Sequence, residues 1–284
     1  MPELPEVEIT ARRLSEALAG VSIESVTAPG INALKTFAPP LDSLAGHQIE
    51  GVRRIGKHMV VDVSGDLHLL LHLMSAGRLQ LYDKRASFKD RTSRLLVRLD
   101  GGGELRLREF GTKQRAWVKL LDGPGLAEDE ALAKLGPDAY PDPPADLAAL
   151  LKPQKGRPLQ AVLRDQQVIT GIGRSWVDEI LWVAKLSPFK RAGELDADEA
   201  AALRAAIVDR LGAALDLYEE QVKLPIPDKL PLPLQVHRHH GEPCPRCGTT
   251  LEAIHYDEQV LAYCPAEQTG GKVLKDRRLS RLLK

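Results

Sequence analysis

The stretch MPELPEVEITARRLSEAL, residues 1–18, determines how the N-terminal half of the chain is interpreted. Pro5 suits the first turn of a helix, where its missing N–H group leaves no hydrogen bond unmade. Carboxylates accompany it, near the positive end of the helix macrodipole. Apolar residues recur with helical spacing from Val7 to Leu18, and Gly20 stands where a helix stop is expected. The stretch therefore predicts an amphipathic helix.

A helix start does not explain Pro2, the second residue of the chain. Removal of the initiator methionine before a small residue would leave Pro2 with a free secondary amine. The reference pKa of an α-amino group is about 8, and the positive end of a helix further disfavours its protonated form. A neutral amine can attack an aldehyde carbon to form a Schiff base, and the neighbouring Glu3 is placed to move protons. Pro2 and Glu3 are therefore candidate catalytic residues.

The composition sets the size and class of the protein. A chain of 284 residues, 27% charged and 43% apolar, is large enough for two domains with their own cores. No apolar run approaches the length of a membrane span, and the acidic N-terminus does not resemble a signal peptide. The three cysteines cannot all pair, which predicts a reducing cytoplasm.

Charge is balanced overall but clustered locally. The 39 Lys and Arg residues equal the 39 Asp and Glu residues, so the net charge gives no support for nucleic-acid binding. Between Lys152 and Arg191, however, eight cations stand against three anions, and Lys272–Lys284 holds six cations against one aspartate. Two such patches can hold a phosphate backbone, although a solvated surface is the commoner meaning of a charge run.

The N-terminal half reads as β-structure after its first helix. Segment 59–73 predicts a strand, a Ser-Gly-Asp turn and a second strand, and 93–110 predicts a hairpin around 101–103. We therefore expect an α+β fold, in which residues 1–135 form a catalytic β-sandwich that carries the N-terminal helix. The Pro- and Asp-rich stretch at 136–150 predicts a domain linker.

The second half changes to a helical period. Segments 159–169 and 175–186 predict two helices that flank TGIGR, and 197–221 predicts a long amphipathic helix that begins with a capping box. Proline-rich residues 224–234 can form neither a helix nor an inner strand, so they predict an exposed, stiff loop. The expected domains are a helical one and a small cysteine-containing one, residues 151–235 and 236–284.

Clustered cysteines indicate a metal site near the C-terminus. Cys244 and Cys247 form one knuckle, and Cys264 follows after sixteen residues. Two facing knuckles make a zinc ribbon, which is too small to fold without its metal. The last position of the second knuckle is Glu267, whose carboxylate can ligate zinc. Alternative fourth ligands are His237, His239, His240 and His255. The competing interpretation is a ribbon without metal, with Cys264 as a buried thiol.

Two short motifs are weaker signals for phosphate binding. Gly171 and Gly173 lie in TGIGR between two predicted helices, where backbone N–H groups can approach a phosphate and Arg174 can add charge. A glycine-containing connection is also common for steric reasons alone. Lys57 in GKH precedes a predicted strand, and taken alone it is better explained as a surface lysine.

Together these motifs resemble one known family. MPELPEVE, RRIGKH, DQQVITGIGRSWVDEIL and EPCPRC, with CPAEQTGGK after it, occur in the order and spacing of the formamidopyrimidine-DNA glycosylase/endonuclease VIII family of base-excision repair enzymes. The resemblance covers essentially the whole chain and is closer to the formamidopyrimidine branch. It implies a helix-two-turn-helix in the helical domain and a zinc-ribbon-like β-hairpin at the C-terminus, with structural Zn²⁺ and no organic cofactor.

The resemblance implies a catalytic mechanism. Pro2 attacks C1′ of a damaged nucleotide and expels the base, and the imine then allows β- and δ-elimination, which nicks the DNA. Glu3 resembles the general acid/base, Lys57 a lysine that holds the phosphate near the lesion, and Glu179 a glutamate that supports the catalytic region. The implied partner is damaged double-stranded DNA with one nucleotide flipped out, bound mainly through phosphates. We expect a monomer without membrane contact, in a bacterial-type cytoplasm and on the nucleoid.

The chain departs from the family at the residues that fill the gap left by the flipped nucleotide. The void-filling methionine aligns with Ser75, and Met74 comes one place early. The family's RRFG is REFG here, so Arg108 and Phe110 remain while Glu109 replaces an intercalating arginine. Amino groups of cytosine and guanine can donate to a carboxylate. We hypothesise that Glu109 changes which opposite base, or which form of DNA, is accepted.

Other implied DNA contacts are partly altered. His72 matches a phosphate-contacting histidine. Arg174, directly after Gly173, replaces an asparagine that binds phosphate and can keep that contact. Gln259 replaces an arginine of the ribbon, so it can donate a hydrogen bond but brings no charge. Glu267 takes the place of the fourth cysteine.

Three functions are compatible with the sequence. The leading hypothesis is a bifunctional DNA glycosylase and abasic-site lyase, because the catalytic set is complete. The second is a non-catalytic or lyase-only binder of damaged or abasic DNA. The altered zinc ribbon favours it, and so do the changes at Ser75 and Glu109, the predicted wedge that fills the gap left by the flipped nucleotide. The third is a metal-ribbon interaction module. The lesion, the opposite base and any preference for single-stranded or cross-linked DNA are not fixed by the sequence.

Overall fold

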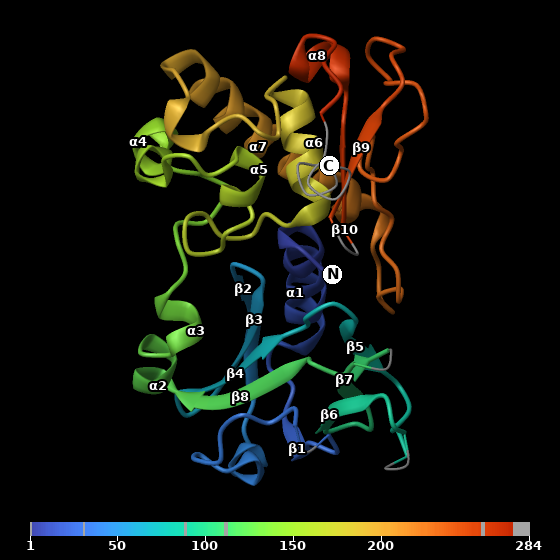
Figure 1. Ribbon diagram of the computed structural model, residues 1–284. Coiled ribbons are helices and arrows are strands. Elements are labelled where there is room, and N and C mark those ends of the chain that lie inside the picture. Colours follow the sequence, from blue (N-terminus) through green and yellow to red (C-terminus); the bar gives the residue numbers. More distant parts are fainter. Residues whose placement is uncertain (1, 31, 88–89, 111–112, 257–258, 275–284) are drawn as a thin grey trace. The chain divides into compact units, whose positions relative to one another are not determined.

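The computed structural model describes residues 2–30, 32–87, 90–110, 113–256 and 259–274, and it separates into two compact units (Figure 1). The first unit comprises residues 1–134 and 215–231. The second comprises residues 135–214 and 232–284. The domain boundaries expected from the sequence stay a prediction, but one segment is notable. Residues 215–231 follow the helical unit in the chain and make their contacts with the N-terminal unit.

Helix α1 (Leu4–Leu18) opens the first unit and is the helix that the sequence predicts. Its apolar face is buried, from Leu4 to Leu18, and it packs against strand β2 (Ile49–Ile55). Ser15 Oγ accepts a hydrogen bond from Val52 N at 3.0 Å. A Cβ at Gly51 would lie 3.2 Å from that hydroxyl, so glycine permits the close approach. The helix is thereby fixed on the sheet.

Two four-stranded antiparallel sheets form the rest of this unit. One sheet has the order β1 (Ile23–Thr27), β6 (Ser93–Leu99), β7 (Glu104–Glu109) and β5 (Gly77–Tyr82). The other has the order β2, β3 (His58–Val63), β4 (Leu67–His72) and β8 (Trp117–Asp122). The two hairpins that the sequence predicts are confirmed as β3–β4 and β6–β7. Short helices follow β8, namely α2 (Gly123–Ala127) and α3 (Glu130–Ala133).

The second unit is mainly helical. Its helices are α4 (Leu147–Leu151), α5 (Leu159–Val162), α6 (Arg174–Val183), the first part of α7 (Ala197–Gln221) and α8 (Pro265–Thr269). Strands β9 (Glu252–Tyr256) and β10 (Gln259–Tyr263) form the C-terminal hairpin. The predicted long helix at 197–221 is confirmed, including its capping box between Asp196 and Glu199. No described helix is long and apolar enough to cross a membrane.

The predicted helix at 159–169 is wrong, because α5 is only one turn. The Gln166 side chain donates to the carbonyls of Arg164 and Ile172 and accepts from Gly171 N. These bonds wrap the chain around one amide group, so residues 163–171 form a compact turn. Such a turn has no helical hydrogen-bond ladder, although its apolar residues have a helix-like spacing.

The end of α7 and the proline-rich segment after it pack on α1 and β5. Arg13 donates through Nε to Val222 O at 2.8 Å, and through a terminal nitrogen to Glu219 O at 2.8 Å and the Glu219 carboxylate at 2.6 Å. Gln80 on β5 donates to Ile226 O at 2.7 Å. Residues 222–231 contain neither helix nor strand, as their prolines predict, but hydrogen bonds fasten them to their own unit.

Replacing Arg13 with methionine should lower the free energy of unfolding by about 2–4 kcal/mol, because it leaves carbonyl groups without donors in a mostly buried site. Arg12 is the matched control, since it also pairs with Glu219 but its side chain is 41% exposed, against 10% for Arg13. Arg12→Met should cost less than about 1 kcal/mol. Urea unfolding followed by circular dichroism measures both free energies of unfolding. Equal losses for the two variants would contradict the stabilising role of the Arg13 hydrogen bonds.

Candidate functional site

The first turn of α1 is closed by two buried glutamates. Glu3 is the N-cap residue, and its backbone N–H donates to Glu6 Oε2 at 2.8 Å. The Glu3 carboxylate accepts in return from the backbone N–H of Glu6, which completes a capping box. Tyr218 donates its hydroxyl to the other oxygen, Glu6 Oε1, at 2.9 Å. The Pro2–Glu3 peptide bond is therefore oriented by the Glu6 carboxylate.

A tight hairpin carries Lys57 beside this helix. Ile55 of β2 pairs with His58 of β3, so Gly56 and Lys57 alone make the turn, and Gly56 has a φ of 58°. Arg54 pairs with Glu8 of α1 at 2.8 Å, which ties the hairpin to the helix. Lys57 is buried. The surface-lysine interpretation is therefore wrong.

His72 at the end of β4 is a neutral imidazole. Its Nδ1 accepts from Met74 N at 2.9 Å, so a proton on the ring belongs to Nε2. Burial, with the positive charges of His58 and Lys57, lowers the pKa of His72 to about 3. The ring also stacks on Trp117 with centroids 5.9 Å apart. At neutral pH it can offer a phosphate an N–H donor but no charge.

The turn after His72 is tight. Met74 has a φ of 52°, in the left-handed region, and Gly77 N donates to Leu73 O at 2.8 Å. A Cβ at Gly77 would lie 2.3 Å from the Leu73 carbonyl oxygen, so only glycine fits there. Ser75 is exposed at the tip, and Met74 is half-buried. The structure thus presents a hydroxyl at the position predicted to fill the void.

Arg108 and Phe110 form a stacked pair at the end of β7. The Arg108 guanidinium lies 4.5 Å from the Phe110 ring centroid, and it donates to Tyr82 Oη at 3.0 Å and Thr92 Oγ1 at 3.1 Å. Phe110 is 36% exposed. An exposed aromatic ring that is held by a cation can insert next to a base.

Glu109 does not point outward as the wedge hypothesis requires. Its side chain is 1% exposed, and its two oxygens accept from Arg115 N at 2.7 Å and Ala116 N at 2.9 Å. Arg94 Nε lies 3.8 Å from Oε2. The carboxylate therefore holds the end of the loop that connects β7 to β8. It is a structural acceptor here, and inserting it into DNA would break both hydrogen bonds.

In the second unit, two adjacent carboxylates on α6 organise the chain that follows α7. Glu179 is fully buried and accepts from three backbone N–H groups, those of Gln235, Val236 and His237, at 2.8–2.9 Å. Asp178 accepts from His237 Nδ1 at 2.6 Å and from Ala262 N at 3.0 Å. Burial raises the pKa of Asp178 to about 6. Glu179 thus fixes residues 235–237, a segment the sequence does not connect with it.

The predicted phosphate contacts of this unit lie at the start of α6. Gly173 is the N-cap residue, with extended backbone, and Arg174 is the first residue of the helix and is exposed. The Arg174 cation is therefore accessible to an anion at this helix N-terminus. The side chain of Gln259, the remaining predicted contact, lies outside the described residues.

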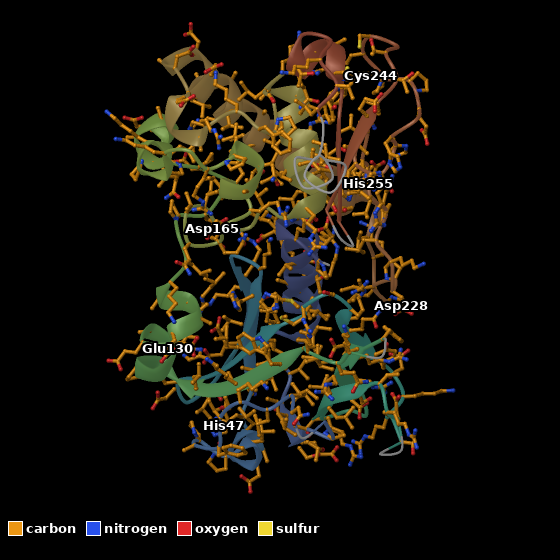
Figure 2. All side chains as sticks on the ribbon, in the orientation of Figure 1. His47, Glu130, Asp165, Asp228, Cys244 and His255 are labelled. Atoms are coloured by element: carbon orange, nitrogen blue, oxygen red, sulfur yellow. The ribbon has the colours of Figure 1, made fainter. Side chains whose placement is uncertain are left out.

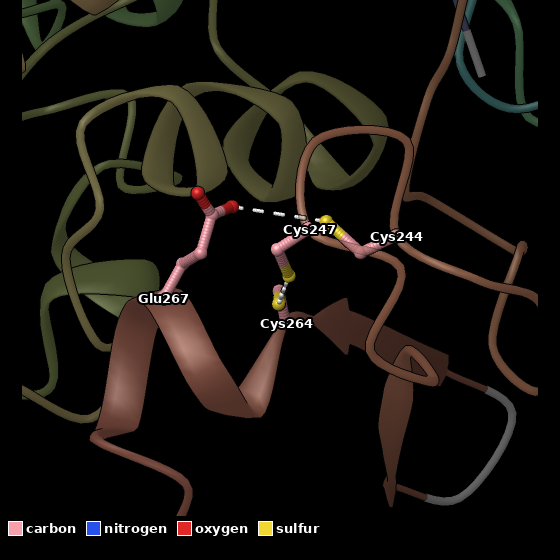
Figure 3. A group of neighbouring side chains, drawn as sticks. All are labelled: Cys244, Cys247, Cys264 and Glu267. Atoms are coloured by element: carbon pink, nitrogen blue, oxygen red, sulfur yellow. Dashed lines mark hydrogen bonds between the residues drawn. The ribbon is translucent and has the colours of Figure 1, made fainter.

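The three cysteines converge with Glu267, as Figure 3 shows. One ligand atom from each of these residues lies within 4.8 Å of the others. Cys247 Sγ and Cys264 Sγ are 3.5 Å apart, and Cys244 Sγ is 3.7 Å from Glu267 Oε2. Hydrogen bonds from Thr249 lower the pKa of Cys247 to about 7, which favours a thiolate there.

The alternative histidine ligands have other neighbours. Among the described residues, the metal-ligating group contains Glu267 and none of the four histidines. His237 binds Asp178, His239 binds Glu242, and the rings of His240 and His255 meet edge to face with centroids 5.7 Å apart. Arg246, which the sequence does not single out, pairs with Glu267 at 2.7 Å and stacks on Trp182 at 4.0 Å.

Two further residues with a role in the first unit have no local signal in the sequence. Tyr218 reaches Glu6 across 212 positions of the chain, and nothing in its own helix indicates the contact. Asp228, labelled in Figure 2, accepts from Gln80 Nε2 at 3.1 Å through its carboxylate and from Arg78 Nε through its carbonyl. Only the tertiary fold brings these partners together.

Family models match both parts of the chain. The formamidopyrimidine-DNA glycosylase N-terminal domain matches residues 1–113, and the formamidopyrimidine-DNA glycosylase H2TH domain matches residues 135–225. The chain belongs to the formamidopyrimidine-DNA glycosylase family. The resemblance inferred from its motifs is confirmed, and so is the branch to which it is closer.

Individual family members agree over almost their full length. Formamidopyrimidine-DNA glycosylase of Herpetosiphon aurantiacus is 33% identical over 287 residues, covering 94% of this chain and 100% of that protein. The Moorella thermoacetica enzyme is 35% identical over 273 residues, covering 89% and 94%. A crystal structure of Lactococcus lactis Fpg with DNA that contains N7-benzyl-Fapy-dG superposes with a TM-score of 0.84 at 26% identity, covering 94% and 100%. The predicted α+β family fold is confirmed.

Glu109→Ala should lower the free energy of unfolding by about 2–4 kcal/mol, because two backbone donors in a buried loop lose their acceptor. Glu50→Ala is the control, since Glu50 is exposed on β2, and it should change stability by no more than about 0.5 kcal/mol. Thermal and urea unfolding measure both variants. A Glu109 variant as stable as the Glu50 variant would restore the hypothesis of an outward-facing wedge.

Proposed function

We propose that this protein is a bifunctional DNA glycosylase and abasic-site lyase that removes oxidised bases through a Schiff base on Pro2. The family assignment supports a DNA glycosylase that acts in the repair of damaged bases. The observation that carries the finer proposal is the capping box at the start of α1. It gives the Pro2–Glu3 peptide a single orientation and keeps a carboxylate next to the nucleophile.

The proposed reaction begins when the Pro2 nitrogen attacks C1′ of the damaged nucleotide. The N–C1′ bond forms with the nitrogen lone pair, and the glycosidic bond breaks with its electrons on the departing base, which takes up a proton. Opening of the sugar ring gives the iminium, and loss of a C2′ proton then expels the 3′ phosphate by β-elimination. A further δ-elimination expels the 5′ phosphate. Glu3 carries protons in these steps.

The proposed partner is damaged duplex DNA, bound through its phosphates. Buried Lys57, on a two-residue turn, is proposed to contact the phosphate nearest the lesion. His72 Nε2–H and the N-terminus of α6 with Arg174 supply further donors. The Lactococcus lactis relative was crystallised with lesion-containing DNA, and the similarity of fold supports the same class of partner here. Glu179 is proposed to support the segment at 235–237.

A damage-binding protein without efficient base excision is the second candidate. The buried position of Glu109 favours it, because no cation stands at the position where an intercalating arginine is expected. The stacked Arg108–Phe110 pair and exposed Ser75 would then be the described residues nearest the gap. Covalent trapping separates the two candidates, since a binder forms no imine.

Zinc is the proposed ligand of the cysteine cluster. Zn–S bonds of about 2.3 Å in a tetrahedron put two sulfurs about 3.8 Å apart, and the sulfurs of Cys247 and Cys264 lie at 3.5 Å. Three thiolates and a carboxylate are ligands that zinc accepts. The fourth ligand is proposed to be Glu267, which Arg246 orients from outside the cluster. The metal would join the loop at 244–247 to the start of α8.

The purified protein should form a covalent adduct with duplex DNA that contains an abasic site, and with 8-oxoguanine DNA, when borohydride is added. Peptide mapping should find the adduct on Pro2. Pro2→Gly should slow single-turnover trapping strongly, and Glu3→Gln should slow it about 100-fold or more. Arg12→Met, on the same helix, is the control and should trap normally. Binding without any trapping would favour the second candidate.

The protein should contain one zinc ion per chain by elemental analysis. Glu267→Ala should weaken zinc binding about 10- to 100-fold in competition with a chelator, whereas Glu267→Cys should retain it. His255→Gln is the matched control, because His255 is exposed and faces His240. A loss of zinc in His255→Gln but not in Glu267→Ala would show that the fourth ligand is His255 and not Glu267.

A further inference from the structure

We propose that Tyr218 is a positioning residue for the reaction at Pro2. It holds the Glu6 carboxylate, and through that carboxylate the Pro2–Glu3 peptide, in one orientation. The inference rests on the proposed function of Pro2 and Glu3. It adds a residue from the far end of the first unit's sequence, in the last turns of α7, to the machinery at the start of α1.

The contacts form a chain from a phenol to a backbone amide. Tyr218 is fully buried, and its hydroxyl donates to Glu6 Oε1 at 2.9 Å. Glu6 Oε2 accepts from Glu3 N at 2.8 Å. Each oxygen of one carboxylate thus has a different donor, which fixes both its position and its rotation. Because Glu3 N belongs to the Pro2–Glu3 peptide, the same carboxylate sets the plane of that peptide and the place of the Pro2 Cα atom.

Tyr218 is itself firmly held. One residue later, Glu219 accepts from Arg13 through both its carbonyl and its carboxylate, and Val222 O accepts from Arg13 Nε. On the other side, Gln80 of β5 donates to Ile226 O. The segment therefore cannot move away from α1 without breaking several hydrogen bonds in a buried region. A tyrosine mounted in this way can serve as a rigid reference for Glu6.

The electrostatic surroundings of Glu6 determine how the Tyr218 hydroxyl affects the protonation of the Pro2 amine. In the described part of the chain, the charged and titratable groups that act on Glu6 include Glu3 from α1, Tyr218 from α7 and Arg78 from β5. Burial and the negative charge of Glu6 raise the pKa of the Tyr218 phenol, so it remains a neutral donor. Without this donor, less of the negative charge of Glu6 is neutralised; because Glu6 Oε2 accepts from the N–H of Glu3, the residue after Pro2, that charge favours a protonated amine at Pro2.

The test compares wild type with Tyr218→Phe in single-turnover borohydride trapping on a preformed abasic site, over a range of pH. The rate at neutral pH should fall about tenfold. The acid limb of the pH profile should move to higher pH, because the amine retains its proton longer. The dissociation constant for duplex DNA with a tetrahydrofuran site should change by less than about twofold. Tyr140→Phe, in the other unit, should match wild type in all three.

Combining Tyr218→Phe with Glu6→Gln tests the route of the effect. If Tyr218 acts through Glu6, the double variant should trap at the rate of Glu6→Gln alone. Additive losses, or a Tyr218→Phe profile identical to that of wild type, would overturn the inference while the trapping of wild type still supports the proposed function. Absence of trapping by wild type would overturn the proposed function, and this inference with it. Thermal unfolding of each variant shows whether lost activity reflects lost fold.

Discussion

The reciprocal hydrogen bonds between Glu3 and Glu6 are the interaction on which the proposed chemistry depends. A helix N-terminus leaves its first N–H groups without partners inside the helix, and here a buried carboxylate satisfies one of them at the residue that follows Pro2. The same carboxylate accepts from Tyr218. One local capping motif is thus also the point where the end of α7 meets α1, and it joins helix stability to the orientation of the nucleophile.

Much of the fold could be predicted because its determinants are local. Helix α1, the hairpins β3–β4 and β6–β7, and α7 with its capping box follow from periodicity, turn residues and caps that lie within a few positions of one another. Reliance on local spacing also accounts for the wrong prediction of a helix at 159–169. Apolar spacing favours a helix there, but the Gln166 side chain binds one backbone group before it and two after it, and spacing carries no information about such a competitor.

The site was predictable in its residue types and less so in its contacts. Pro2, Glu3 and the cysteine cluster could be identified from motifs, since spacing alone brings their neighbours close. The place of Glu109 could not, because a charged residue at the end of a strand is usually exposed. Its burial depends on two N–H groups at 115 and 116 that happen to point at it. Likewise, the sequence around Lys57 suggests a surface lysine. Its burial depends on the tertiary fold, in which its hairpin is tied to α1 by the Arg54–Glu8 pair.

Buried carboxylates also bear on the balanced charge of the chain. Glu6 accepts from one backbone N–H group, Glu109 from two and Glu179 from three, so peptide dipoles stabilise their charge in place of water. Among the described residues, seven Asp and Glu side chains are buried, against four Lys and Arg. Those burials leave 29 of the 33 described Lys and Arg side chains, and 29 of the 36 described Asp and Glu side chains, at least partly exposed. Phosphate binding responds to how exposed charges are grouped, as in the stretch from Lys152 to Arg191 with its eight cations and three anions, so a zero net charge is no argument against a DNA partner.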